Sequence, residues 1–202
     1  MPRRRHQDVV EALLDRIVAG DFAPGDRLPK EVVVAEQYGV NRGTAREALR
    51  ALEERRVAIV KHGRGSIVQP PSSWNVLDPT VAAALLRARG RAGFGREIGH
   101  ARLTVEPELA ALAAEHAGRV DRAALAQAMK QDAPTGAFIT ELGRIARNRP
   151  LAAVAVALRS LAPAPAPPDG ALHEVLEGVI AGDPKRARAA MEDVVGRGPR
   201  TG

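Results

Sequence analysis

The side chains best suited to chemistry lie together in residues 41–50, where polar and basic residues open a stretch with helical periodicity. Asn41 is suited to cap a helix, because its side-chain oxygen can accept a hydrogen bond from a free N–H of the first turn. Apolar residues recur at helical spacing and define one face: Ala45, Ala48, Leu49 and Leu52. The polar and basic side chains fall elsewhere: Arg42, Thr44, Arg46 and Arg50. Such a helix fits the DNA major groove, although a surface helix with solvated arginines shows the same pattern.

The composition limits the classes of function that need to be considered. The net charge of +6 suits a polyanionic partner without identifying it. Aromatic residues make up only 2%, so binding of single strands by base stacking is disfavoured. The absence of cysteine excludes disulfides and thiolate metal sites, and it fits the cytoplasmic location that we expect. No apolar run reaches the roughly 18 residues of a membrane-spanning helix.

Two further helices are expected before residue 41. Apolar residues at helical spacing predict a first helix that ends at Gly20: Val9, Val10, Leu13, Leu14, Ile17 and Val18. A turn-rich connection leads to a short second helix, Glu31–Tyr38, and Gly39 permits a left-handed turn out of it. The stretch that opens at Asn41 then continues to about Arg55. A short helix, a turn and a longer helix together form the helix-turn-helix pattern.

A basic hairpin is expected directly after these helices. Residues 57–60 and 66–68 are β-prone, and the loop between them contains Gly63. The loop also supplies positive or hydrogen-bond-donating side chains: Lys61, His62 and Arg64. A nucleotide-binding phosphate loop is a poor alternative, because no Gly-Lys-Ser/Thr follows and no helix opens there. The hairpin therefore has the position and charge of a wing that approaches DNA.

Residues from about 6 to 69 resemble the DNA-binding domain of the GntR family of bacterial transcription regulators. The matching segments agree in order and spacing: Pro24-Gly25-Asp26-Arg27-Leu28-Pro29, Ala35-Glu36-Gln37-Tyr38-Gly39-Val40, Arg42-Gly43-Thr44-Ala45-Arg46-Glu47-Ala48-Leu49, Leu52-Glu53 and Gly63-Arg64-Gly65. The resemblance implies a winged helix-turn-helix that binds a pseudo-palindromic operator as a homodimer. It also implies residues that reach bases and phosphates: Asn41, Arg42, Thr44 and Arg46. His62 and Gly63 would enter the minor groove or its edge, and Arg27 would contact the DNA backbone.

Two positions depart from the usual pattern of that family. Lys30 stands where a Ser usually caps the second helix, so this helix should lose roughly 1 kcal/mol of capping free energy. We expect Lys30 to contact a phosphate instead. Val32 stands where some relatives have an Arg that binds guanine, and valine cannot make that contact. The preferred operator should therefore differ from the commonest one in the family.

The middle of the chain predicts a linker over residues 70–95. Pro70-Pro71-Ser72-Ser73 opens it, and a helix follows with Asp78 as its cap and Pro79 in its first position. Apolar side chains should dock this helix on a neighbouring surface: Trp74, Leu77, Val81 and Leu85. Residues 87–95 contain several glycines and arginines and are expected to form a second, flexible joint. The expected domains are therefore 1–69, 70–95 and 96–202.

The remainder of the chain predicts an all-helical domain. Six runs of apolar residues have helical spacing, and the prolines of residues 163–168 separate the fourth run from the fifth. The region resembles a shortened form of the C-terminal effector domain of the FadR subgroup, called FCD. The matching segments are Arg102-Leu103-Thr104-Val105-Glu106-Pro107-Glu108-Leu109-Ala110, Asn148-Arg149-Pro150-Leu151 and Val175-Leu176-Glu177-Gly178-Val179-Ile180-Ala181-Gly182-Asp183. The fold class is then mainly α, with one small β-hairpin in a winged helix-turn-helix and an all-α bundle.

Many FCD domains bind a divalent metal through one Asp and three His, and this chain lacks those ligands at the positions that can be aligned. The positions hold other residue types: Thr135, Ile139, Leu172 and Val194. His173 is displaced by one residue, which rotates it by about 100° around a helix. No metal or other cofactor is therefore expected.

One effector-pocket residue is implied by the resemblance. An Arg at the position of Arg102 can face the effector in the family. The alternative is an exposed ion pair with Glu106, four residues further along the helix. The sequence leaves both interpretations open.

The combined patterns predict a sequence-specific DNA-binding regulator, expected to be a repressor and a homodimer that a small effector could release from a double-stranded operator. In one alternative, the C-terminal domain only dimerises and senses no ligand. An enzyme acting on nucleic acid or a small molecule is a more distant alternative. The sequence shows no paired nucleophile and base, no clustered carboxylates and no metal-ligand spacing.

Overall fold

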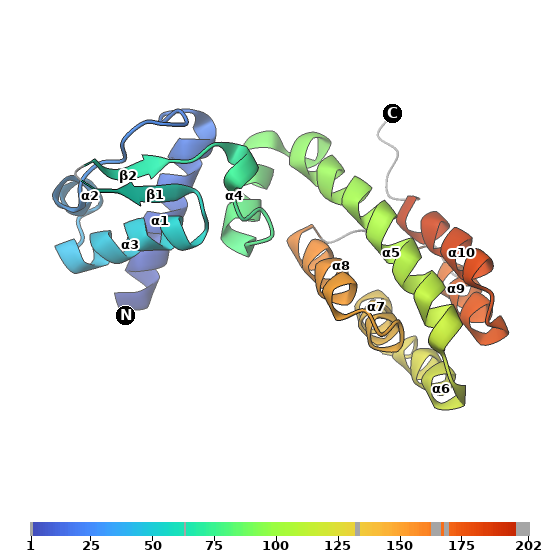
Figure 1. Ribbon diagram of the computed structural model, residues 1–202. Helices are drawn as coiled ribbons and strands as arrows, with labels where there is room; N and C mark the ends of the chain where they lie inside the picture. Colours follow the sequence, from blue (N-terminus) through green and yellow to red (C-terminus); the bar gives the residue numbers. More distant parts are fainter. Residues whose placement is uncertain (1, 63, 132–133, 163–166, 168–169, 197–202) are drawn as a thin grey trace. The chain divides into compact units, whose positions relative to one another are not determined.

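The computed structural model describes residues 2–62, 64–131, 134–162, 167 and 170–196 (Figure 1). The chain divides into two compact units, Met1–Phe94 and Gly95–Gly202. The domain limits expected from the sequence remain predictions. Each unit is considered separately below.

The N-terminal unit is built on three helices: α1 (Pro2–Ala19), α2 (Glu31–Tyr38) and α3 (Arg42–Glu54). Both α1 and α2 pack against α3. The apolar stripe predicted for α1 is buried at Val9, Val10, Leu13, Leu14 and Ile17. It meets the buried face of α3, which consists of Ala45, Ala48, Leu49, Ala51 and Leu52. The predicted helix-turn-helix is thus confirmed.

A two-stranded antiparallel hairpin follows α3. Strand β1 (Ala58–Lys61) pairs with β2 (Gly65–Val68) in a register that places Ala58 opposite Val68 and Lys61 opposite Gly65. Strand β1 is displaced by one residue from its predicted limits, and β2 begins one residue earlier than predicted. Val57 precedes β1 because its N–H donates to the Leu52 carbonyl oxygen, closing the end of α3. The predicted mainly helical fold with one small hairpin is confirmed.

The segment before α2 pairs with the hairpin. Leu28 N–H donates to the Ser66 carbonyl oxygen at 2.9 Å, and Val68 N–H donates to Asp26 at the same distance. Arg27 forms a bridge with Ile67 between these two hydrogen bonds. The turn-rich connection therefore anchors one edge of the wing.

The linker helix α4 (Pro79–Arg89) packs against α1. The Asp78 side chain caps it by accepting hydrogen bonds from the N–H groups of Thr80 and Val81, as predicted. The same carboxylate pairs with Arg55 at 3.1 Å, at the C-terminal end of α3. Three of the four predicted docking residues are buried, namely Trp74, Val81 and Leu85, whereas Leu77 is 39% exposed. A π-helical turn, Arg91–Gly95, lies within the segment predicted to be a joint.

The C-terminal unit contains the six predicted helices. They are α5 (Arg96–His116), α6 (Arg119–Ala128), α7 (Pro134–Ile145), α8 (Arg149–Leu161), α9 (Ala171–Ala181) and α10 (Pro184–Gly196). The Asp183 side chain caps the start of α10 by accepting hydrogen bonds from the N–H groups of Lys185 and Arg186. In the part of the chain that is described, no helix has the length and apolar character needed to cross a membrane.

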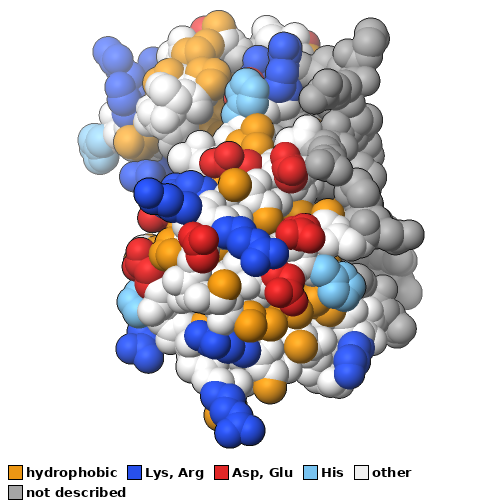
Figure 2. Space-filling model, turned by 90° about the vertical axis from the view of Figure 1, so that its right-hand side faces the viewer, with side chains coloured by type: hydrophobic (Ala, Val, Ile, Leu, Met, Phe, Trp, Pro, Cys, Tyr) orange, Lys and Arg blue, Asp and Glu red, His pale blue; other side chains and the backbone are white. Residues whose placement is uncertain are grey.

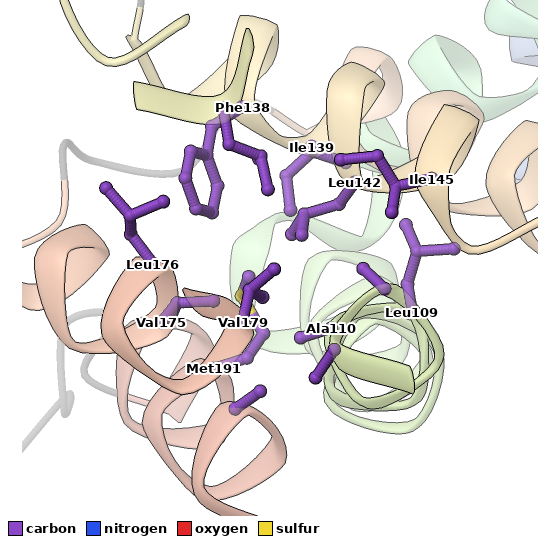
Figure 3. Packing of buried hydrophobic residues seen from close by; sticks show 14 of the residues in the cluster. Leu109, Ala110, Phe138, Ile139, Leu142, Ile145, Val175, Leu176, Val179 and Met191 are labelled. Atoms are coloured by element: carbon purple, nitrogen blue, oxygen red, sulfur yellow. The ribbon is translucent and has the colours of Figure 1, made fainter. Parts of the chain in front are cut away.

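The core of this unit is a cluster of aliphatic side chains around Phe138. Figure 3 shows side chains of α5, α7, α9 and α10 that point toward one another. The most completely buried large members are Leu109, Leu125, Phe138, Ile139, Leu142 and Met191. Close packing of this kind makes the unit sensitive to changes of a single methyl group.

Helices α9 and α10 are in close contact at Gly178. A Cβ atom at this position would lie 2.7 Å from the backbone nitrogen of Ala187 and 2.8 Å from its Cα. Backbone atoms cannot move aside as a flexible side chain can. Glycine is therefore required here by the contact between the helices.

We expect Gly178→Ala to lower the free energy of unfolding by about 1–3 kcal/mol, because overpacking forces the helices apart. Urea unfolding of the full chain, followed by far-UV circular dichroism, measures this change. Gly99→Ala in α5 is the matched control, since a Cβ there meets no atom within 4 Å. The control should be neutral or stabilising because alanine favours helix. Equal destabilisation by both substitutions would contradict the close-contact argument.

Candidate nucleic-acid interface

The start of α3 is fixed by the side chain of Asn41. Its Oδ1 accepts a hydrogen bond from the Thr44 N–H at 2.8 Å, so the predicted cap is present. Gly39 precedes it with φ 61°, in the left-handed region that reverses the chain between α2 and α3. The N–H of Val40 closes this turn by donating to the Ala35 carbonyl oxygen. The turn and the cap together set the direction in which the first turn of α3 projects.

Basic side chains occupy the exposed face of α3. Arg42 and Arg46 are exposed in the first turns, and Thr44 is half-buried between them. Arg46 lies 3.9 Å from Glu47 in a weak, solvated pair, and Arg50 lies 3.6 Å from the same carboxylate. Ion pairs this exposed contribute little to stability, so these arginines remain free to exchange partners. The sequence analysis placed these side chains off the apolar face, and the three arginines are exposed in the structure.

The wing presents a second set of exposed cations. Lys61, His62 and Arg64 are all exposed, and the Arg64 N–H donates to the Lys61 carbonyl oxygen to close the turn. Gly63, which was also predicted to approach DNA, lies outside the described residues. A hydrogen bond of 3.0 Å between Ser66 Oγ and Glu53 Oε1 joins β2 to α3. Sequence analysis did not predict this contact, because hydroxyl–carboxylate pairs have no characteristic spacing.

The two remaining predicted contacts lie before α2. Arg27 is exposed and is held beside the wing by its bridge to Ile67. Lys30 is exposed at the N-terminus of α2 and makes no side-chain capping bond there. The role of each predicted side chain toward DNA remains a prediction.

A small hollow beside the start of α3 was not predicted. It has a volume of about 320 Å³ and is lined by Val32, Ala35, Glu36, Gly39, Val40, Asn41 and Arg42. Three consecutive valines, residues 32–34, were the available signal, because a short helix cannot bury three adjacent side chains against one neighbour. Val34 is fully buried, whereas Val32 is 39% exposed.

Comparison with known proteins identifies this unit. Residues 5–68 match the family described as "Bacterial regulatory proteins, gntR family". Residues 5–68 form a gntR-family domain. This match extends from the first helix to the last residue of the wing, which is the region for which the sequence resemblance was strongest.

Relatives of known name extend the similarity beyond this gntR unit. The galactonate operon transcriptional repressor of Escherichia coli is 32% identical over 123 residues, which cover 61% of this chain. The chain spans only about half of that repressor, 54% of its length. The transcriptional repressor NanR of Salmonella newport is 27% identical over 220 residues, covering 95% of this chain and 83% of NanR. The names given to both proteins describe repressors of transcription.

A solved structure supports the fold alone. The Listeria monocytogenes protein Lar, which controls the expression of the agr system, aligns with a TM-score of 0.58 at 16% sequence identity. The alignment covers 95% of this chain and 93% of Lar.

The implied effector-pocket residue, Arg102, is held in a buried ionic cluster. Its Nε donates to Glu106 Oε1 at 2.7 Å, and Arg159 Nη2 donates to Glu106 Oε2 at 2.5 Å. The Glu106 side chain is fully buried, and the Arg102 side chain is 8% exposed. The alternative of an exposed ion pair was therefore wrong, although the predicted partner was right. The residue that sequence analysis missed is Arg159, which lies 53 positions from Glu106 in the chain.

Burial dominates the electrostatics of Arg159. Removal from water lowers the pKa of its guanidinium, and the neighbouring Glu106 carboxylate partly opposes this by favouring the charged form. Arg102 adds to the lowering because it is a like charge nearby. One carboxylate thus compensates two cations, and the cluster depends on it.

An open groove of the C-terminal unit lies away from Arg102. It has a volume of about 1360 Å³. Its lining comes from α5, α7, α8 and the turn between α7 and α8. Arg147, Arg149 and His116 are among the lining residues, together with Val156. Arg102 is absent from this lining. Arg102, whose side chain is 8% exposed, is therefore not part of this groove.

The positions aligned with the family's metal ligands are largely part of the hydrophobic core. Ile139, Leu172 and Val194 are buried in the Phe138 cluster. Their side chains offer no donor atoms to a divalent cation, so the residues present do not fit the metal. Over the described ranges, no three His, Cys, Asp or Glu residues are grouped as metal ligands. The metal-free state of this unit remains a prediction.

We expect Glu106→Gln to lower the free energy of unfolding by about 3–5 kcal/mol, because it leaves the buried Arg102 and the part-buried Arg159 without a counter-charge. Urea unfolding of the full chain measures the change. Glu108→Gln is the control on the same helix, since Glu108 pairs with Arg188 at the surface. An exposed pair contributes about 1 kcal/mol at most. Similar losses in both variants would show that the buried cluster has no special role.

Proposed function

We propose that this chain is a sequence-specific DNA-binding transcription regulator that acts in the bacterial cytoplasm as a repressor and a homodimer. The observation that carries the proposal is the Asn41-capped start of α3, which presents Arg42 and Arg46 outward in a gntR-family unit. The described wing residues on either side of Gly63 add exposed cations. A duplex with one negative charge per phosphate fits this distribution.

The proposal assigns different roles to the two sets of cations. Arg42, Thr44 and Arg46 enter the major groove and read base edges, as the first turn of a recognition helix does. His62 and Gly63 approach the minor groove or its edge. The remaining basic side chains hold the phosphate backbone and fix the register of the unit: Arg27, Lys30, Lys61 and Arg64.

Two copies of the chain would read the two halves of a pseudo-palindromic operator. We assign dimerisation to the helical C-terminal unit. The names of the galactonate repressor and NanR support repression as the output. The proposal includes release of the operator DNA by a small effector. It assigns no catalytic activity to the chain.

The experiment that tests this proposal is selection of bound sequences from random duplexes with the full chain. We expect one enriched, inverted-repeat sequence, bound with the steep salt dependence of roughly 6–10 phosphate contacts. Arg42→Ala should weaken binding to that sequence by about 1–3 kcal/mol and relax the base preference at one position per half-site. Fluorescence anisotropy with labelled duplexes measures both effects.

Arg50→Ala is the matched control for Arg42→Ala, because Arg50 is exposed on the same helix two turns further from its start. It should leave the base preference unchanged. Absence of any enriched sequence would overturn the proposed function. Equal weakening of selected and random duplexes by Arg42→Ala would reduce Arg42 to a phosphate contact.

A second possibility for the C-terminal unit is that it dimerises without sensing any ligand. The apolar side chains at the aligned metal positions and the engagement of Arg102 by Glu106 favour it. Addition of Zn²⁺ or Mn²⁺, or removal of metal with a chelator, should then leave the melting temperature of the full chain unchanged. A bound metal would raise the melting temperature through linkage, and such a rise would contradict this possibility.

A further inference from the structure

The hollow beside the start of α3 is lined by both apolar and polar residues. The apolar or small ones come from α2 and the turn after it: Val32, Ala35, Gly39 and Val40. The polar ones are Glu36, Asn41 and Arg42. Arg42 is the residue to which we assign base reading, so the hollow lies directly next to the proposed DNA surface.

Val32 does not contribute its side chain to the buried core of the unit. Val34 and Ala35 anchor α2 in the core, whereas Val32 and Val33 are 39% and 48% exposed. Neither exposed valine is needed to bury the helix. Apolar surface left in water at the edge of a concave site favours contact with an apolar group of a partner.

The major groove offers one apolar group at the edges of its bases, the C5-methyl of thymine. We propose that the hollow receives this methyl group, with Val32 as its specificity-determining contact. The thymine would lie next to the base pair that Arg42 reads. This inference rests on the proposed function, and it names one base that the operator must contain.

The polar residues of the hollow would favour a different base, cytosine, which is the competing outcome of the test. The Glu36 carboxylate also lines it and could accept a hydrogen bond from the exocyclic amine of cytosine. Thymine has a carbonyl oxygen in place of that amine and would be disfavoured by direct contact with Glu36. The test therefore has to separate the methyl group from the hydrogen-bonding edge of the base.

Uracil makes this separation, because it has the hydrogen-bonding edge of thymine without the methyl group. In the sequence selected by the full chain, each thymine is replaced singly by deoxyuridine, and affinities are measured by fluorescence anisotropy. We expect one replacement per half-site, next to the base pair affected by Arg42→Ala, to weaken binding about fourfold, the value for one buried methyl-sized group. Other replacements should have little effect.

Two variants assign the effect to Val32. Val32→Ala should bind the thymine and uracil duplexes equally, since the contact for the methyl group is lost. Val33→Ala is the matched control, because Val33 is similarly exposed on the same helix but does not line the hollow. It should keep the fourfold preference. Both side chains are exposed, and thermal melting verifies that each variant is folded.

The outcomes distinguish failure of this inference from failure of the proposed function. An enriched sequence in which every uracil replacement is neutral overturns the inference and leaves the function intact. Preference for cytosine at the position, or a uracil penalty that persists in Val32→Ala, also overturns it. If no sequence is enriched at all, the proposed function fails and the inference fails with it.

Discussion

Burial of one face of α3 is the constraint on which the N-terminal unit depends. Ala45, Ala48, Leu49 and Leu52 are buried on this face, and both α1 and α2 pack against the helix. Because 3.6 residues make one turn, burying these positions turns Arg42 and Arg46 toward water. The same constraint aligns the wing, since Glu53 holds Ser66 and Val57 bonds back to Leu52. Burial of this one face of α3 therefore orients both parts of the proposed DNA surface, the start of α3 and the wing.

The distribution of charge follows a different principle in each unit. The described cations of the α3 start and the wing have few close acidic partners, as expected of groups that exchange water for phosphate. In the C-terminal unit, Arg102 and Arg159 are withdrawn from water and held by Glu106. On the face that Figure 2 draws, acidic and basic side chains are interspersed rather than separated. The positive charge that a polyanion could meet is therefore found mainly at the start of α3 and in the wing, where the cations have few acidic partners.

Periodicity and capping residues were sufficient to predict most of the fold. Local sequence patterns predict the helices on either side of Gly39, the hairpin and the six C-terminal helices. What escaped prediction depends either on residues distant in sequence or on a local surface shape that periodicity does not describe. The partner of Glu106 is 53 residues away, and the hollow at Val32 exists only because α2 meets the turn before α3. Burial of the Arg102 pair could not be predicted, because an i,i+4 pair has the same spacing in water and in a core.

The Asp78 side chain connects the end of α3 to the start of α4. Its carboxylate is the cap of α4 and also the partner of Arg55, whose own guanidinium donates to the Ala51 carbonyl oxygen near the end of α3. A single side chain therefore links the last turn of α3 to the first turn of the linker helix α4. The capping of α4 and the charge compensation of Arg55 therefore depend on one carboxylate. Protonation or loss of that carboxylate would weaken the start of α4 and the end of α3 together.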